Sequence, residues 1–226
     1  MTDEKQNLRM MEKCGNYNRW IADTLKPYVS GNVLEVGVGT GSVAKYFFNE
    51  KYYGIDIQES HIKHCQKLFK HPDKFMYCDV EKKLPAFFRH RFDTVIMCNV
   101  LEHCYNDRFA VDNAWRMLKK GGRLVVLVPA HKNLFGEIDV SDGHYRRYSL
   151  KMLMDLFGDR FIVEHYNEMN MAGSLGWYVT GKVFPTKVHK EEDLGLFDDL
   201  VPVFRWVENR IKIPFGLSLF IVGEKK

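Results

Sequence analysis

The residues best suited to bind a ligand lie in a glycine-rich segment. Gly37, Gly39 and Gly41 follow a buried-type strand pattern at 32–37. Glycines let the backbone approach a ligand closely and adopt positive φ angles. A helix that starts after such a turn offers free N–H groups and the positive end of its dipole. The segment therefore predicts a site for a nucleotide-like ligand that carries an anionic group.

Two further features indicate which nucleotide this turn would hold. The dinucleotide fingerprint G-x-G-x-x-G needs a glycine where Ser42 stands, since the glycines here are spaced G-x-G-x-G. Glu35, two residues before the first glycine, would repel a pyrophosphate but attract the ammonium or sulfonium of S-adenosylmethionine, directly or through water. The pattern disfavours an NAD-dependent dehydrogenase and favours S-adenosylmethionine.

Acidic residues also end the next two predicted strands. Asp56 can accept hydrogen bonds from both ribose hydroxyls of an adenosine, and Ile57 beside it can pack on the adenine ring. Asp79, with Val80 beside it, can accept from the exocyclic amine of adenine. The alternative for Asp79 is a turn residue that binds its own backbone. These residues indicate adenosine without distinguishing between cofactors.

A fourth strand pattern at 92–100 brings Asn99 and Val100 to the end of the strand. In open α/β folds, ligands bind at the carboxyl edge of the sheet. We therefore expect Asn99 to lie beside the bound ligand.

A parallel sheet is needed to bring these residues to one edge, and the chain has suitable strands. Short runs rich in Val, Ile, Tyr and Phe alternate with stretches of helical spacing, as in a parallel sheet covered on both faces. The alternation predicts right-handed β-α-β units in a doubly wound α/β sheet. The predicted strands are 32–37, 52–57, 75–80, 92–100 and 122–130, and the predicted helices between them are 42–50, 58–70 and 103–120.

The second half of the chain is less regular. The polar stretch 131–149 predicts a loop, and 171–214 has no clear period. We interpret 171–214 as an elaboration before the last strand, for example a cap over the active site. The other predicted elements are an amphipathic helix at 16–29, a helix at 150–157, and strands at 161–169 and 217–226.

Taken together, the motifs resemble those of class I S-adenosylmethionine-dependent methyltransferases. The nearest likeness is to the small-molecule type 11 and type 12 group, which includes quinone-biosynthesis methyltransferases. It covers about residues 16–130, through the motifs EVGVGTG, GID, CDV, FDTVIMCNVLEH and LKKGGRLVVLVP. The resemblance implies a Rossmann-like, mostly parallel sheet of order 3-2-1-4-5-7-6, with strand seven antiparallel and helices on both faces.

The resemblance also implies how S-adenosyl-L-methionine would bind. The methionine end would lie against Glu35 and the three glycines, the ribose against Asp56 and the adenine against Asp79. Asn99 would flank the cofactor, and two aromatic residues of the N-terminal helix would close over it, namely Tyr17 and Trp20.

Two histidines are candidates for the general base. His144 stands in the loop after the fifth strand, at the edge where a methyl acceptor must bind, and is the better candidate. His103, after the fourth strand, is the second, although a residue that organises the loop is the preferred interpretation there.

The segment 131–149 also resembles a subgroup of bacterial methyltransferases with poorly defined substrates. Its Arg146 and Arg147 could clamp a carboxylate or phosphate of the acceptor. The alternative is that they pair with Asp139 and Asp142 and fix the loop.

No metal ion is predicted. His61, His64 and Cys65 have helical spacing, but they lie on a polar stretch next to lysines. A solvated helix face is the preferred interpretation.

Composition and charge limit the remaining choices. The chain has 226 residues, of which 46% are hydrophobic, which predicts one domain. Within it we expect an N-terminal helical cap at 1–30, a cofactor-binding core at 31–130, and a substrate-side half at 131–226 with an insertion at about 171–214. The net charge of +4 is scattered, so no nucleic-acid arm is indicated.

The cellular location is predicted from cysteines and from the absence of targeting patterns. Five cysteines with no C-x-x-C pair suggest a reduced protein. The first residues are polar, and no apolar run approaches the ~20 residues of a membrane span. We expect a cytoplasmic protein without membrane insertion, and the sequence does not predict its oligomeric state.

The predicted reaction is an SN2 methyl transfer to a small-molecule acceptor, anionic if the two arginines bind it; the acceptor atom remains open. A nucleic-acid methyltransferase is the less favoured alternative, because the segment from Asn99 to Glu102 lacks the prolines of the motif that grips a flipped base. A non-catalytic module that binds the cofactor also remains open.

Overall fold

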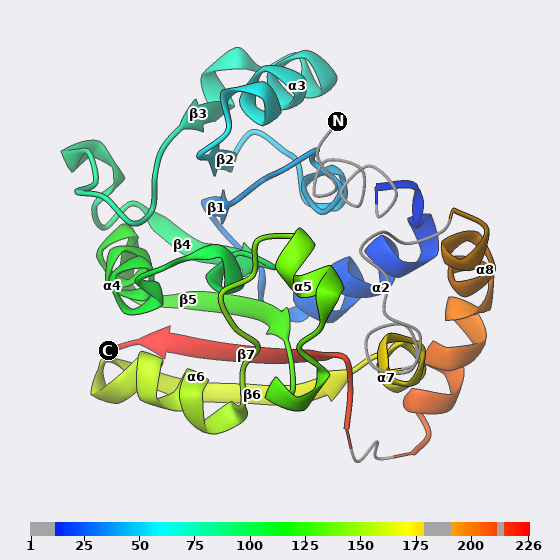
Figure 1. The fold of residues 1–226 in the computed structure, drawn as a ribbon. Helices are drawn as coiled ribbons and strands as arrows, with labels where there is room; N and C mark the ends of the chain where they lie inside the picture. The colour runs from blue at the N-terminus through cyan, green and yellow to red at the C-terminus, as the bar shows by residue number, and fades with distance from the viewer. Residues whose placement is uncertain (1–11, 179–190, 212–214) are drawn as a thin grey trace.

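The computed structural model describes residues 12–178, 191–211 and 215–226. At its centre is a seven-stranded sheet of order β3-β2-β1-β4-β5-β7-β6, which confirms the predicted topology (Figure 1). Strands β1 to β5 pair in parallel, and β7 is antiparallel to β5 and β6. The strands are β1 (Val33–Val36), β2 (Tyr52–Asp56), β3 (Phe75–Tyr77), β4 (Phe92–Cys98), β5 (Leu118–Pro129), β6 (Phe161–Met169) and β7 (Ser218–Lys225).

Helices cover both faces of the sheet, as predicted. Side chains of a strand alternate between two buried clusters, so that Val126 belongs to one and Val125 to the other. The first cluster includes residues of α4 (Asp107–Met117) and α6 (Leu150–Phe157). The second includes residues of α2 (Gly15–Leu25), α3 (Glu59–Phe69) and α8 (Glu191–Glu208).

The segment 42–50, predicted as a helix, forms only a short 3-10 turn at Ala44–Tyr46. Its aromatic residues explain the difference. Phe48 stacks on Phe69 and Phe75, with ring centroids 4.5 and 5.8 Å apart, which turns the chain toward α3 and β3. The α-helix expected to present its dipole after the glycine turn is therefore missing.

The loop predicted at 131–149 contains a 3-10 turn, Lys132–Leu134, and a short helix, α5 (Glu137–Ser141). The predicted helix at 150–157 is present with these bounds as α6, and the remaining predicted helices have shifted ends. α4, for example, begins later than predicted, because the Asn106 side chain accepts the N–H of Phe109 and caps the helix there.

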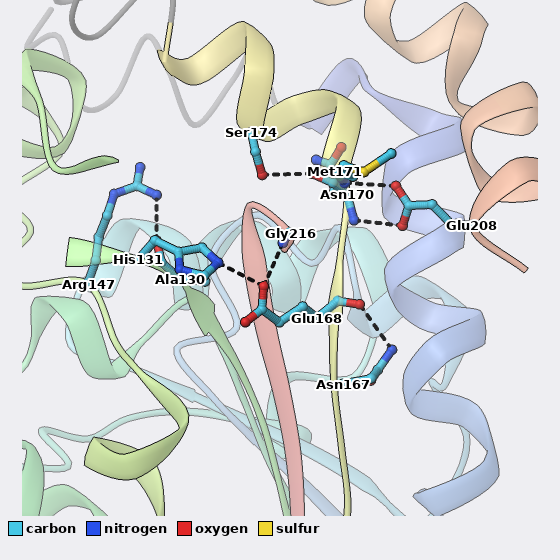
Figure 2. Close-up of polar contacts among 10 residues, drawn as sticks. All are labelled: Ala130, His131, Arg147, Asn167, Glu168, Asn170, Met171, Ser174, Glu208 and Gly216. Atoms are coloured by element: carbon cyan, nitrogen blue, oxygen red, sulfur yellow. Dashed lines mark hydrogen bonds and ion pairs between the residues drawn. The ribbon is translucent and has the colours of Figure 1, made fainter. Parts of the chain in front are cut away.

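The stretch 171–214 contains two helices, α7 (Met171–Tyr178) and the long α8, while residues 179–190 and 212–214 lie outside the described part. Glu208 of α8 accepts the backbone N–H groups of Asn170 and Met171, at 3.0 and 2.7 Å (Figure 2). These bonds join the end of α8 to the start of α7. None of the helices in the described ranges is long and apolar enough to cross a membrane.

Candidate active site

The turn after β1 is formed by three glycines with positive φ angles: 69° at Gly37, 54° at Gly39 and 80° at Gly41. The N–H of Gly37 donates to the carbonyl of Ile55 at 2.8 Å, which fixes the start of the turn on β2. A Cβ at Gly37 would lie 2.5 Å from the side chain of Val100, whereas a Cβ at Gly39 would meet open space. Gly37 is required for packing, and Gly39 leaves the backbone open to a ligand.

Asp56 ends β2 directly beside this turn. Its Oδ2 accepts the N–H of Gly39 at 2.9 Å, and its Oδ1 accepts the N–H of Gln58 at 2.8 Å. Burial acts to raise the pKa of Asp56, but contact with His61 and these two N–H groups outweighs it, so the pKa is lowered. Asp56 is therefore an anion whose remaining lone pairs can accept ribose hydroxyls.

Glu35 is sealed inside the sheet, 2% exposed, and accepts a hydrogen bond from the hydroxyl of Tyr52. Burial raises the pKa of Glu35 to about 8, against the effect of the Tyr52 hydrogen bond, and the charge of Asp56 raises it further. The carboxyl group is thus mainly protonated at neutral pH in this state. The predicted attraction to an ammonium needs it to lose that proton when the ligand binds.

The adenine end was predicted from Asp79, Val80 and Ile57. Oδ1 of Asp79 accepts the N–H of Glu81 at 2.9 Å, and Oδ2 lies 3.2 Å from the Lys82 ammonium. This is the turn role considered as the alternative. Val80 is buried, whereas Ile57 is exposed and free to cover a ligand. A contact of these residues with adenine remains a prediction.

Asn99 follows β4 and adopts a positive φ of 53°, which is strained for a residue with a side chain. Strain of this kind is concentrated at functional sites, and Asn99 is exposed at the carboxyl edge of the sheet. The two aromatic residues predicted to close over the cofactor are both buried. Tyr17 packs edge-on against Phe197 of α8, and Trp20 lines a pocket that includes His165 of β6. Their contact with the cofactor remains a prediction.

Thr40 is a residue of the glycine turn that the sequence analysis did not single out. Its hydroxyl is buried and has no hydrogen-bond partner among the described residues. Buried polar atoms without a partner are uncommon, and each calls for a missing group. An unpaired hydroxyl, an accessible backbone at Gly39 and an anionic Asp56 fit a ligand with both an anionic group and a ribose.

The two predicted bases come together at the same edge. His103 belongs to a 3-10 turn after β4, and its ring lies 4.7 Å from that of His144, edge to face. Glu102 lies beside them, 1% exposed. Although His103 is an exposed residue, desolvation of its imidazole by the surrounding groups, and then the charge of the nearby His144, lower its pKa to about 4.

His144 is held by an acid that the sequence analysis considered only as an arginine partner. Asp139, fully buried, accepts from Nδ1 of His144 at 2.8 Å and from Nε of Arg147 at 2.9 Å. Arg147 also donates to the carbonyl of Ala130 at 3.2 Å and is 2% exposed. Arg147 therefore fixes the loop, which was the alternative to clamping a substrate.

Arg146 is also engaged, but not with the predicted Asp142. Its Nη1 lies 2.8 Å from Asp107 at the start of α4, and its Nη2 donates to the carbonyl of Tyr105. Both arginines are therefore engaged within the protein, and they no longer support the prediction of an anionic acceptor.

Thr40, Glu102 and Asp139 complete the site but were not predicted as parts of it. A signal for Thr40 was available, since it stands between two of the turn glycines. Glu102 and Asp139 could not be recognised from the sequence, because they are brought to the site by contacts between distant segments. One such contact is the hydrogen bond that the N–H of Tyr145 donates to the carbonyl of Glu102 at 2.8 Å.

Comparison with known proteins adds an independent line of evidence. Residues 34–126 match the family model described as "Methyltransferase domain". The hybrid PKS-NRPS synthetase thnA of Trichoderma harzianum is 31% identical over 132 residues, which are 52% of this chain and 3% of that protein. The polyketide synthase component of the lovastatin nonaketide synthase of Aspergillus terreus is 29% identical over 124 residues, 50% of this chain and 4% of that protein. This chain spans only a few per cent of the length of these relatives.

Solved structures share the fold at low sequence identity. The geranyl diphosphate C-methyltransferase of Streptomyces coelicolor, in complex with Mg²⁺, geranyl diphosphate and S-adenosyl-L-homocysteine, has a TM-score of 0.63 and 12% identity, covering 92% of this chain and 77% of that one. A protein of Bacillus halodurans described as a methyltransferase has a TM-score of 0.59 and 20% identity, covering 91% and 98%. Both carry the Rossmann-like fold of this chain.

Proposed function

We propose that this chain, which carries a class I S-adenosylmethionine-dependent methyltransferase domain, transfers a methyl group to a small-molecule acceptor. The observation that carries the proposal is the bond between Gly39 and Asp56. This hydrogen bond joins the glycine turn to an anionic carboxylate. The turn is then available to the methionine end of S-adenosylmethionine, and Asp56 is available to its ribose.

In this proposal the cofactor lies along the carboxyl ends of β1 to β4. The hydroxyl of Thr40, unpaired among the described residues, contacts its carboxylate, and Asp56 accepts its ribose hydroxyls. Ile57 and Asp79 border the adenine, and Asn99 flanks the sulfonium end. The cofactor supplies an activated methyl group; the protein aligns the acceptor and excludes water.

The transfer is an in-line displacement. A lone pair of the acceptor attacks the methyl carbon, the C–S bond breaks, and S-adenosylhomocysteine leaves; a hydroxyl or amine acceptor also releases a proton. Alignment can supply up to roughly 7–11 kcal/mol of the barrier. The acceptor site is placed at the ends of β4 and β5, beside His103 and His144, and a nucleobase is disfavoured because no proline motif follows β4.

The relatives support a small-molecule acceptor in general terms. The lovastatin synthase component and the geranyl diphosphate C-methyltransferase are named for small molecules. We also propose that this domain acts in the cytoplasm as a single unit, with α2, α7 and α8 bordering the site.

Binding and turnover test the proposal separately. Calorimetry with S-adenosylhomocysteine should give one site per chain, and Asp56→Ala should weaken binding by about 10–100-fold, because charge-assisted hydrogen bonds are lost. Asp73→Ala, which removes an exposed aspartate, is the matched control. Unchanged affinity in Asp56→Ala would remove the ribose assignment. Binding without S-adenosylhomocysteine production from S-adenosylmethionine, across a broad acceptor panel, would favour the non-catalytic module.

A further inference from the structure

Three side chains that can bind metal ions converge at the acceptor end of the site. Glu102 and His103 lie in the 3-10 turn after β4, and His144 comes from the segment after α5. One ligand-type atom of each lies within 4.8 Å of those of the other two. Groups from two distant segments therefore face a common point.

Glu102 has a buried carboxyl group that lacks hydrogen-bond partners in the described part of the chain. Both oxygens are inaccessible to solvent, and neither has a hydrogen-bond partner among the described residues. A buried carboxylate without partners is costly, since nothing replaces the water it has lost. A bound cation would supply the missing partner.

His144 is oriented as metal-binding histidines are. Its Nδ1 contacts Asp139, which is held in turn by Arg147 and by the N–H of Gly136 at 2.9 Å. The carboxylate of Asp139 accepts a hydrogen bond, so in a neutral His144 the ring proton lies on Nδ1. Nε2 of His144 then has a lone pair available for a metal ion. A carboxylate behind the ring that fixes the tautomer and raises ligand basicity is the usual support of a metal-bound imidazole.

We propose that Glu102, His103 and His144 bind one divalent transition-metal ion, such as Zn²⁺, Co²⁺ or Mn²⁺. Two imidazoles and one carboxylate suit this class better than Mg²⁺ or Ca²⁺, which prefer oxygen ligands. Three protein ligands leave a position open, as in catalytic zinc sites. This arrangement replaces the general-base role predicted for His144.

The role of the ion in catalysis depends on the function proposed above. An acceptor hydroxyl at the open position would have a lowered pKa. Its proton passes to solvent, its oxygen forms the new bond to the methyl carbon, and the C–S bond breaks to leave S-adenosylhomocysteine. The acceptor class is thus a hydroxyl compound, such as an alcohol or phenol, that can chelate or approach a metal ion.

The test uses metal binding without cofactor. The metal-stripped protein is titrated with Co²⁺, and binding is followed by the visible absorption bands of Co²⁺ and by calorimetry. We expect one ion per chain, and at least a 100-fold loss of affinity in Glu102→Gln and in His144→Ala. His64→Ala, at an exposed histidine of α3, should bind as the unchanged protein does. Asp139→Asn should weaken binding by about 10–100-fold through the orientation of His144.

Glu102→Gln also separates metal binding from folding. It removes a buried charge without changing the side-chain shape, so the metal-free variant should melt at the same temperature as the unchanged protein or higher, while Co²⁺ no longer raises its melting temperature. No stoichiometric Co²⁺ binding, or binding that persists in both variants, would overturn the proposal. Co²⁺ binding in a protein that fails to bind S-adenosylhomocysteine would instead refute only the methyltransferase function.

Discussion

The N–H of Gly39 donates to Oδ2 of Asp56 at 2.9 Å, so the turn after β1 and the end of β2 hold each other in place. A methyl side chain at Gly39 would point into open space, whereas one at Gly37 would clash with Val100. Gly39→Ala should cost about 1–2 kcal/mol, since only its positive φ of 54° opposes the substitution, but it should abolish cofactor binding by filling the open space. Gly37→Ala should destabilise more, because its Cβ would clash with Val100.

Urea unfolding and calorimetry on both variants check this pair. Equal losses of stability would contradict the difference in packing. Cofactor binding by Gly39→Ala at the original affinity would show that the ligand does not approach the turn at that position.

Glu35 makes stability depend on pH. Its pKa is raised from 4.5 to about 8 in the folded protein, so between those values the folded state holds a proton that the unfolded chain releases. The stabilisation is complete below pH 4.5 and is lost as the pH rises through about 8, with a slope of up to about 1.4 kcal/mol per pH unit. Glu35→Gln should remove this slope.

The measurement is the free energy of unfolding by urea at several pH values from 5 to about 8.5, for the protein and for Glu35→Gln. Glu50→Gln, at an exposed glutamate, is the control and should leave the slope unchanged. Parallel curves for the protein and Glu35→Gln would show that Glu35 is ionised in the folded state.

Asp139→Ala should destabilise the protein by about 3–5 kcal/mol, because it leaves the buried guanidinium of Arg147 unpaired. The double variant Asp139→Ala, Arg147→Met removes both charges and should recover part of the loss. A double-mutant cycle by urea unfolding measures the coupling, and additive effects would mean that the pair is not coupled.

Glu208→Ala should cost about 0.5–2 kcal/mol, the range for losing a helix cap, because two N–H groups at the start of α7 lose their acceptor. Glu208→Gln keeps one acceptor oxygen and should lose less. Hydrogen exchange at Asn170 and Met171 should become faster in Glu208→Ala; protection that stays unchanged would show that other groups cap the helix.

The strands of the sheet could be predicted because each one is marked by its own short stretch of sequence. Apolar strands and turn glycines identified β1, β2 and β4, and the order of five motifs implied the topology through family resemblance. The prediction of a helix at 42–50 was wrong. Helical spacing within the segment contains no information about the packing of Phe48 against Phe69 and Phe75, which come later in the chain.

The site was predicted unevenly for the same reason. Asp56 and the glycines stand at strand ends, which a sequence pattern marks. The cluster of Glu102 and His144 depends on residues far apart in the chain, and the partner of Arg146 is Asp107 rather than the nearby Asp142. Sequence spacing does not measure such distances.

Two acidic residues of α8 accept hydrogen bonds from backbone N–H groups at the starts of two other helices. Asp198 accepts the N–H groups of Asn16 and Tyr17 at the start of α2, and Glu208 does the same for α7. α8 thus connects the start of α2, near the beginning of the described chain, with the start of α7 in its second half. A substitution that shortens or rotates α8 should therefore loosen the starts of both helices together, although they are more than 150 residues apart in the chain.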